Sequence, residues 1–256
     1  MEFSRKTYLD RLIERKHNGL VKILTGIHGC GKSYLLRKLF RDHLIKSGVD
    51  PDHIRVYEFP RSEDRSLSSP DAYFADLEKS LEGTGRCCLL LDDVEYLSDA
   101  AEVLNSLSRE DRLDVYDTVN HASGFTTDVP TVFRGRCDAV HVFPLSFAEF
   151  MSGLDGGPHE AWAQYSRYGG MPALVALESE EEKKSWLRGF LKDACVADMV
   201  GQHGVGKTRE LEALIRVVAS CAGQFLNSTR VAKQSASWSV CATSSNLIFF
   251  LMSKKA

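Results

Sequence analysis

Apolar residues in the first part of the chain follow two patterns that alternate. Short apolar or alternating runs, typical of buried or half-buried strands, cover residues 20–25, 53–59, 87–91, 113–116 and 138–142. Helical spacing, in several cases opened by a serine cap, covers residues 8–13, 34–40, 69–81, 98–107 and 146–150. Because strands alternate with helices, the pattern predicts an α/β fold, with a mostly parallel sheet and helices on both faces.

The strand pattern stops after about residue 155. Helical spacing continues over residues 161–168, 179–200 and 208–222, and the tail is rich in Ser, Ala and Thr and weakly patterned. We therefore expect three regions. They are an α/β core over residues 1–155, a small helical lid over residues 156–222, and an incomplete or disordered tail over residues 223–256.

The loop after the first apolar run carries a phosphate-binding pattern. Residues 26–33 fit G-x-x-x-x-G-K-[ST] at every fixed position, between a strand run and a helical stretch. Its glycines let backbone N–H groups wrap a polyphosphate, and the next helix points its positive end at the same anion. The expected nucleotide-binding residues are Gly26, Ile27, His28, Gly29, Cys30, Gly31, Lys32, Ser33 and Tyr34. The alternative, a chance glycine turn with a helix cap at Ser33, does not explain these flanks.

Four side chains are expected to perform the phosphate chemistry. Lys32 would bring its charge to the β- and γ-phosphates, and the Ser33 hydroxyl would bind Mg²⁺. The apolar run 87–91 leads directly into Asp92 and Asp93. Asp92 would hold Mg²⁺ and Asp93 would orient and deprotonate the attacking water. Strand-end acids can also be plain turn residues, but the phosphate loop upstream favours the catalytic interpretation.

The order of the runs favours one branch of the P-loop NTPases. The run 53–59 lies between the phosphate-loop strand and the strand that ends at Asp92. This connectivity is typical of the ASCE type, which includes AAA+ ATPases, helicases and RecA-like motors. In small-molecule kinases and GTPases the two motif strands are usually neighbours in the sheet.

A second segment, residues 201–208, satisfies the same phosphate-loop expression. It follows a stretch with helical rather than strand spacing, and no apolar run ending in an acid comes after it. We therefore interpret it as a glycine loop between two helices, with Thr208 capping the second.

Composition excludes several classes of protein. The 256 residues carry 32 Lys and Arg against 35 Asp and Glu, so the overall charge gives no nucleic-acid footprint. Seven scattered cysteines without C-x-x-C pairs fit a reducing cytoplasm and make a structural zinc site improbable. No apolar run has the length of a membrane span, and no signal-peptide core follows the N-terminus. We expect a cytoplasmic protein without a membrane partner.

The chain resembles the bacterial and archaeal AAA+ ATPases, often known only as ATP-binding proteins, whose ATPase core precedes a C-terminal domain of poorly known role. The segments that carry this resemblance are residues 8–13, 26–36, 89–94, 131–136, 143–150 and 168–172. The resemblance implies a helical lid over residues 161–222 and a winged-helix-like segment from Gly223. It also implies that the chain stops where the family's C-terminal domain begins, as a truncated chain would.

The resemblance also implies further site residues. Arg134 and Arg136 match the family's Arg-Gly-Arg segment, so one of them would be an arginine finger or sensor. Solvation of both, or pairing with Asp138, is an equal alternative. The family's γ-phosphate sensor falls on His121, with Asn120 one position early, and either could serve. Asp93 stands where the family usually has Glu, which lowers the expected rate of hydrolysis.

Three functions follow, in decreasing order of support. The first is a Mg²⁺-dependent AAA+ ATPase that binds and hydrolyses ATP. The second is a nucleotide-gated switch with little hydrolysis. The third is a small-molecule kinase, which residues 161–200 disfavour because they offer few arginines. Expected partners are the nucleotide, further copies of the chain, and DNA or protein bound through the C-terminal region.

The two phosphate-loop patterns can be told apart by substitution. We expect Lys32→Ala to abolish ATP binding, because it removes the charge that meets the phosphates, and Lys207→Ala to leave binding unchanged. Equilibrium titration with a fluorescent ATP analogue measures both. The opposite result would transfer the nucleotide site to residues 201–208.

Overall fold

A computed structural model of the chain describes residues 2–59, 77, 85–96, 100–120, 137–154, 156–192 and 208–220. The chain divides into two compact units, Met1–Lys183 and Lys184–Ala256. The region boundaries expected at residues 155 and 222 remain predictions. None of the helices in the described ranges has the length and apolar character needed to cross a bilayer.

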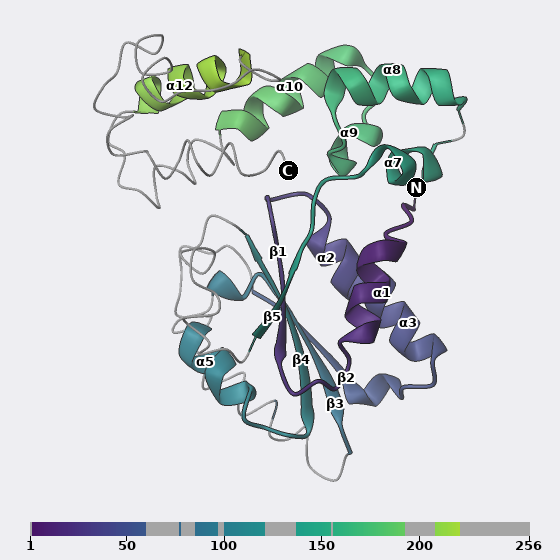
Figure 1. Cartoon of the computed structure of the whole chain (residues 1–256), viewed down its shortest axis with the longest axis vertical. Coiled ribbons are helices and arrows are strands. Elements are labelled where there is room, and N and C mark those ends of the chain that lie inside the picture. The colour runs from purple at the N-terminus through teal and green to yellow at the C-terminus, as the bar shows by residue number, and fades with distance from the viewer. Residues whose placement is uncertain are drawn as a thin grey trace. The chain divides into compact units, whose positions relative to one another are not determined.

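Five parallel strands form one sheet in the order β2-β3-β4-β1-β5 (Figure 1). The strands are β1 (Val21–Gly26), β2 (Ile54–Glu58), β3 (Cys87–Asp92), β4 (Leu113–Asn120) and β5 (Cys137–His141). The predicted α/β fold with a parallel sheet is confirmed. Strand β4 separates β1 from β3, so the two motif strands are not neighbours, as the order of the runs predicted.

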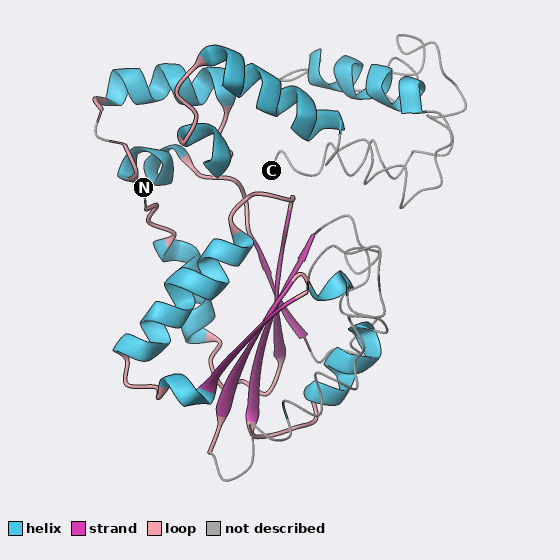
Figure 2. Ribbon diagram, turned by 180° about the vertical axis from the view of Figure 1, so that it is seen from behind, coloured by secondary structure: helices cyan, strands magenta, loops and turns pink. Residues whose placement is uncertain are grey.

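Helices cover both faces of the sheet (Figures 1 and 2). On one side lie α1 (Lys6–Glu14) and a continuous helix made of α2 (Lys32–Tyr34), a π-helical stretch (Leu35–Phe40) and α3 (Arg41–Lys46). On the other lies α5 (Ala100–Leu107). Each face has its own apolar layer: Leu36 and Phe40 belong to the first, Val103 and Leu104 to the second. The sheet is thus buried on both sides, which explains why β1 and β3 are apolar runs rather than alternating ones.

Strand β4 is longer than the sequence pattern predicted. The strand-like run 113–116 ends before Asp117, yet the strand continues to Asn120. Asp is a poor strand former, but pairing with β1 and β3 continues beyond Tyr116 and overrides this local preference. The extension carries Asn120 to the edge of the sheet where β1 ends.

Further helices follow the sheet in the chain. They are α7 (Phe147–Ser152), α8 (Pro158–Tyr168), α9 (Pro172–Val175), α10 (Glu180–Phe190) and α12 (Thr208–Ser220). Ser146 and Glu149 form the predicted capping box of α7, and Ser179 and Glu182 make the equivalent bonds before α10. Of the helix expected over residues 69–81, only Leu77 is described, and it is buried. The glycine loop at residues 201–207 lies outside the described ranges.

A buried ion pair fixes β1 against β4. Lys22, which is fully buried, contacts Asp114, and its ammonium lies 4.5 Å from the centre of the Tyr116 ring. Asp114 also accepts hydrogen bonds from the Tyr116 hydroxyl at 3.0 Å and from the His17 backbone N–H. In the register that these contacts hold, Gly26 lies beside Asn120. The start of the phosphate loop therefore adjoins the last residue of β4.

Removing the cation of this pair should destabilise the protein. We expect Lys22→Met to lower the free energy of unfolding in urea by about 3–5 kcal/mol, because it leaves the Asp114 carboxylate buried without its main countercharge. Lys38→Met is the matched control, since Lys38 pairs with Asp42 on the surface and should contribute little. Equal effects of the two substitutions would show that the buried pair does not secure the strands.

Candidate nucleotide-binding site

The phosphate loop joins β1 to α2 at the carboxyl edge of the sheet. Its glycines adopt conformations that side chains rarely allow: φ is 152° at Gly26, 75° at Gly29 and 100° at Gly31. A Cβ atom on Gly26 would lie only 2.3 Å from the Val142 carbonyl oxygen and 2.9 Å from the Cys30 sulfur. Space and conformation therefore both require glycine here, as the motif predicted.

The loop suits a bound polyphosphate. The helix that begins at Lys32 is preceded by Gly31 in the left-handed conformation and has no capping side chain. The first N–H groups of such a helix favour an anion. The residues present thus fit the phosphate groups of a nucleotide.

The Lys32 ammonium lies at the centre of the site. The side chain is only 4% exposed. Its Nζ donates to the carbonyl oxygens of Gly26 at 3.0 Å and Ile27 at 3.2 Å, and to Oδ1 of Asn120 at 2.7 Å. A lysine ammonium has three N–H donors, and these three oxygens account for all of them. Lys32 therefore connects the phosphate loop to the end of β4.

Asp92 ends β3 at the same edge. Its Oδ1 accepts a hydrogen bond from the Thr118 hydroxyl at 2.7 Å, and its Oδ2 accepts one from Arg37 at 3.1 Å. Arg37 also pairs with Glu58 at the end of β2. These contacts hold the Asp92 carboxylate at the sheet edge, and carboxylate oxygens are ligands that Mg²⁺ prefers.

No group of three or more His, Cys, Asp or Glu side chains in the described part of the chain could hold a metal ion. A Mg²⁺ ion here would depend on Ser33, half-buried in the first turn of the helix, together with Asp92, nucleotide phosphates and water. That mixed set is the usual one for Mg²⁺ beside a nucleotide.

Asp93 follows Asp92 in a left-handed conformation, with φ of 59°. Its N–H donates to the Thr118 hydroxyl at 2.8 Å, and its Oδ1 accepts from the side-chain amide of Asn120 at 3.1 Å. Burial and the nearby charge of Asp92 raise the pKa of Asp93. An acid with a raised pKa is a stronger base than an ordinary Asp, which suits proton abstraction near neutral pH.

Asn120 joins these groups. Its amide oxygen accepts from Lys32, while its amide nitrogen donates to Asp93 at 3.1 Å and to Glu95 at 2.7 Å. Of the two sensor candidates, Asn120 thus lies between the phosphate-loop lysine and the proposed base. The other candidate, His121, lies outside the described residues, and so do Arg134 and Arg136.

The remaining predicted residues have other surroundings. Asp138, a possible partner of the two arginines, pairs with Arg15 at 2.8 Å. His28 is exposed at the tip of the loop. Tyr34 has a raised pKa because its hydroxyl is buried and close to the charge of Glu2, which places that hydroxyl beside the N-terminal segment.

Sequence reasoning missed Glu95 and Arg37. Burial raises the pKa of Glu95 to about 7, although hydrogen bonds from Asn120 oppose this shift. The available signal was a charged residue two positions after the Asp-Asp pair and another within the helix that follows the loop. Neither pattern is specific enough to assign a role without the fold.

The Gly-Gly-Met-Pro segment, residues 169–172, lies beside the phosphate loop. Leu145 N–H donates to the Gly170 carbonyl at 2.7 Å, which anchors the segment. A Cβ on Gly29 would meet the Met171 methyl carbon at 3.4 Å, and one on Gly31 would meet Pro172 at 3.8 Å. The segment therefore packs along two of the loop's three glycines.

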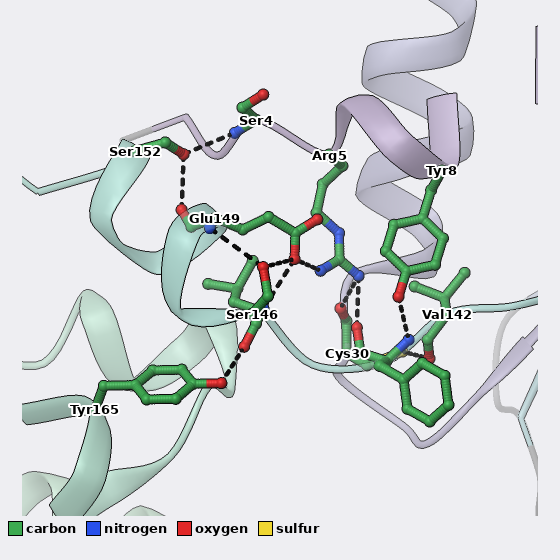
Figure 3. A network of polar contacts seen from close by, with 11 residues as sticks. Ser4, Arg5, Tyr8, Cys30, Val142, Ser146, Glu149, Ser152 and Tyr165 are labelled. Atoms are coloured by element: carbon green, nitrogen blue, oxygen red, sulfur yellow. Dashed lines mark hydrogen bonds and ion pairs between the residues drawn. The ribbon is translucent and has the colours of Figure 1, made fainter. Parts of the chain in front are cut away.

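Arg5 ties the N-terminal segment to the same loop (Figure 3). Its guanidinium, 2% exposed, donates to the carbonyl oxygens of Cys30 at 3.3 Å and Phe143 at 2.6 Å, and pairs with Glu149 at 3.0 Å. Glu149 completes the capping box of α7 from the first turn of that helix. One buried cation thus links the phosphate loop, the segment after β5 and α7, and it holds the back of the loop in place.

Asp117 is buried at the edge of the site. It shares a face of β4 with Val115 and Val119, which belong to the apolar layer of that face. Both its carboxylate oxygens are buried and have no hydrogen-bond partner among the described residues. Burial, then the charges of Glu95, Asp92 and Asp93, raise its pKa well above the ordinary value. The acid therefore opposes folding at neutral pH.

Replacing this acid should stabilise the protein at high pH. A raised pKa in the folded state means that stability is full below the unfolded pKa of about 4 and falls as the pH rises. We expect the free energy of unfolding of Asp117→Val to exceed that of wild type by at least about 1 kcal/mol at pH 8, with a smaller difference at pH 5. Urea unfolding at both pH values measures this. An increase in the free energy of unfolding that is the same at both pH values would show that packing, not charge, is responsible.

Two curated relatives match most of the chain. An uncharacterized protein of Haemophilus influenzae is 25% identical over 234 residues, which is 89% of this chain and 58% of that protein. An uncharacterized protein of Methanocaldococcus jannaschii is 18% identical over 228 residues, 83% of this chain and 49% of that protein. The chain thus spans about half the length of the curated relatives it matches.

Solved structures with a similar fold include the Aeropyrum pernix Orc1 protein in complex with DNA, with 14% identity and a TM-score of 0.45 over 92% of this chain and 77% of that one. AMPPCP-bound DnaA from Aquifex aeolicus has 15% identity and a TM-score of 0.42 over 96% of this chain and 91% of that one. A domain of unknown function matches residues 159–245. A family model described as an AAA domain matches residues 18–151, which is more than half of the chain. The chain therefore belongs to the AAA domain family and contains a nucleotide-binding module of the AAA+ P-loop ATPase type.

Proposed function

We propose that the protein binds ATP with Mg²⁺ and hydrolyses it to ADP and phosphate. One observation carries this proposal: the hydrogen bonds that run from Lys32 through Asn120 to Asp93. These bonds support the proposal because the Lys32 ammonium and the Asp93 carboxylate lie on either side of one polar amide, next to a glycine loop. A plain glycine turn would need none of these groups.

Binding would use the loop and Lys32. The N–H groups at the helix start would hold the phosphates, and the Lys32 ammonium would give up the Gly26 and Ile27 carbonyls for phosphate oxygens. Ser33 and Asp92 would hold Mg²⁺, which when bound neutralises charge on the transferring phosphoryl group. Asn120 would keep Lys32 on the side of the γ-phosphate.

Hydrolysis would use Asp93. The side-chain amide of Asn120 holds its Oδ1, and its second oxygen is left to orient the attacking water and accept its proton. The left-handed backbone and the raised pKa both suit this task. Because Asp is one methylene shorter than the Glu usual in the family, we expect slow turnover.

A nucleotide-gated switch with little hydrolysis is the second candidate. It is favoured by the short Asp93 side chain and by the sharing of the Asn120 amide between Asp93 and Glu95. We further propose a cytoplasmic location and assembly with further copies of the chain. A DNA or protein partner bound through the C-terminal region stays a prediction, and so do the finger or sensor roles of Arg134, Arg136 and His121.

The role of Asp93 can be tested by Asp93→Asn in single-turnover hydrolysis with excess protein. Asn tolerates the left-handed backbone and keeps the size of the side chain, but it cannot take a proton. We expect the rate to fall at least about 100-fold while affinity for a non-hydrolysable ATP analogue stays within threefold.

Asp111→Asn is the matched control, because Asp111 is an exposed acid in a turn away from the loop. Equal rates for wild type and Asp93→Asn would remove Asp93 from the mechanism. Tight binding without turnover in wild type would reject hydrolysis and support the switch.

A further inference from the structure

Glu95 lies in a short 3₁₀ turn (Val94–Tyr96) directly after β3. Its Oε1 accepts two hydrogen bonds from the same residue: the Asn120 backbone N–H at 3.0 Å and the Asn120 side-chain amide at 2.7 Å. The two bonds fix the end of β4 and the direction of the Asn120 side chain together. Glu95 therefore controls the residue that stands between Lys32 and Asp93.

The donor and acceptor chemistry makes this control directional. An Asn side chain can present its oxygen or its nitrogen to a given neighbour. Lys32 only donates and an ionised Glu95 only accepts, so together they turn the oxygen of Asn120 to Lys32 and its nitrogen to the acids. The bond to Glu95, at 2.7 Å, is shorter than the bond to Asp93, at 3.1 Å. Glu95 is thus the closer acceptor for the amide.

We propose that Glu95 is a positioning residue of the nucleotide site, which holds the Asn120 amide so that Lys32 and Asp93 keep their places for hydrolysis. This inference rests on the proposed ATPase function and extends it to a residue outside the sequence motifs. Glu95 acts through Asn120, and no contact with the nucleotide is required of it.

Packing does not explain the residue. Val94, next to it, is fully buried in the apolar layer and anchors the turn. The second oxygen of Glu95, Oε2, is buried without a hydrogen-bond partner in the described part of the chain, and the charge of Asp93 lies near the carboxylate. An acid in these surroundings costs stability. The hydrogen bonds that it accepts from another described residue are the two from Asn120.

Two substitutions separate the hydrogen-bond acceptor from the charge. Glu95→Gln keeps an oxygen that can accept both bonds, whereas Glu95→Ala removes it. Glu102→Ala, on the exposed side of α5, is the matched control. Each full-length variant is compared with wild type for the exchange rate of the Asn120 backbone amide by NMR, for kcat, and for affinity for a non-hydrolysable ATP analogue.

We expect Glu95→Ala to speed exchange of the Asn120 amide at least tenfold and to lower kcat at least tenfold, with analogue affinity within threefold of wild type. Glu95→Gln and Glu102→Ala should stay within threefold in all three measurements. An unchanged exchange rate of the Asn120 amide in Glu95→Ala would overturn the inference. An equal loss of kcat in Glu95→Gln and Glu95→Ala would also overturn it. If wild type shows no turnover, the proposed hydrolysis fails, and faster exchange in Glu95→Ala alone would still show that Glu95 orders Asn120.

Discussion

The Lys32 ammonium is buried at the carboxyl edge of the sheet, where protein oxygens must replace water around a full positive charge. Two of those oxygens are carbonyls of the phosphate loop itself, and the third is the side chain of Asn120. The loop can bring its carbonyls so close because its glycines adopt positive φ. Because the buried ammonium needs these oxygens as hydrogen-bond acceptors, it constrains the conformation of the loop and requires a polar residue at the end of β4.

The order of the strands brings these oxygens to Lys32. Because β4 lies between β1 and β3, the last residue of β4 reaches Lys32 on one side and the acids after β3 on the other. The buried pair of Lys22 and Asp114 at the opposite end of the strands secures this register. Arg5 stabilises the phosphate loop through its hydrogen bond to the Cys30 carbonyl. Distant contacts thus fix the positions of a few polar atoms.

Much of the fold could be predicted from the sequence because its signals are local. Apolar runs gave the strands, and serine caps gave the starts of α7 and α10. The phosphate loop was recognisable because its glycines and Lys32 lie within eight residues of chain. The parallel sheet then followed from the alternation of strands and helices.

The rest of the site could not be predicted, because its partners are far apart in the chain. Glu95 and Asn120 are 25 residues apart, and Arg37 and Asp92 are 55 apart. No spacing rule connects such pairs before the sheet order is known. The end of β4 was misplaced for a related reason: Asp117 reads locally as a break, and only strand pairing keeps the chain extended to Asn120. That extension is what brings Asn120 to Lys32.

The central claim is that this loop, with Lys32 and Asn120, binds the phosphates of a nucleotide. A crystal structure of the protein with Mg²⁺ and a non-hydrolysable ATP analogue tests it most directly. We expect the triphosphate in the loop of residues 26–33, with Lys32 on its β- and γ-phosphates and the metal ion at Ser33 and Asp92. A nucleotide bound elsewhere on the chain, with Lys32 still on the Gly26 and Ile27 carbonyls, would contradict the account.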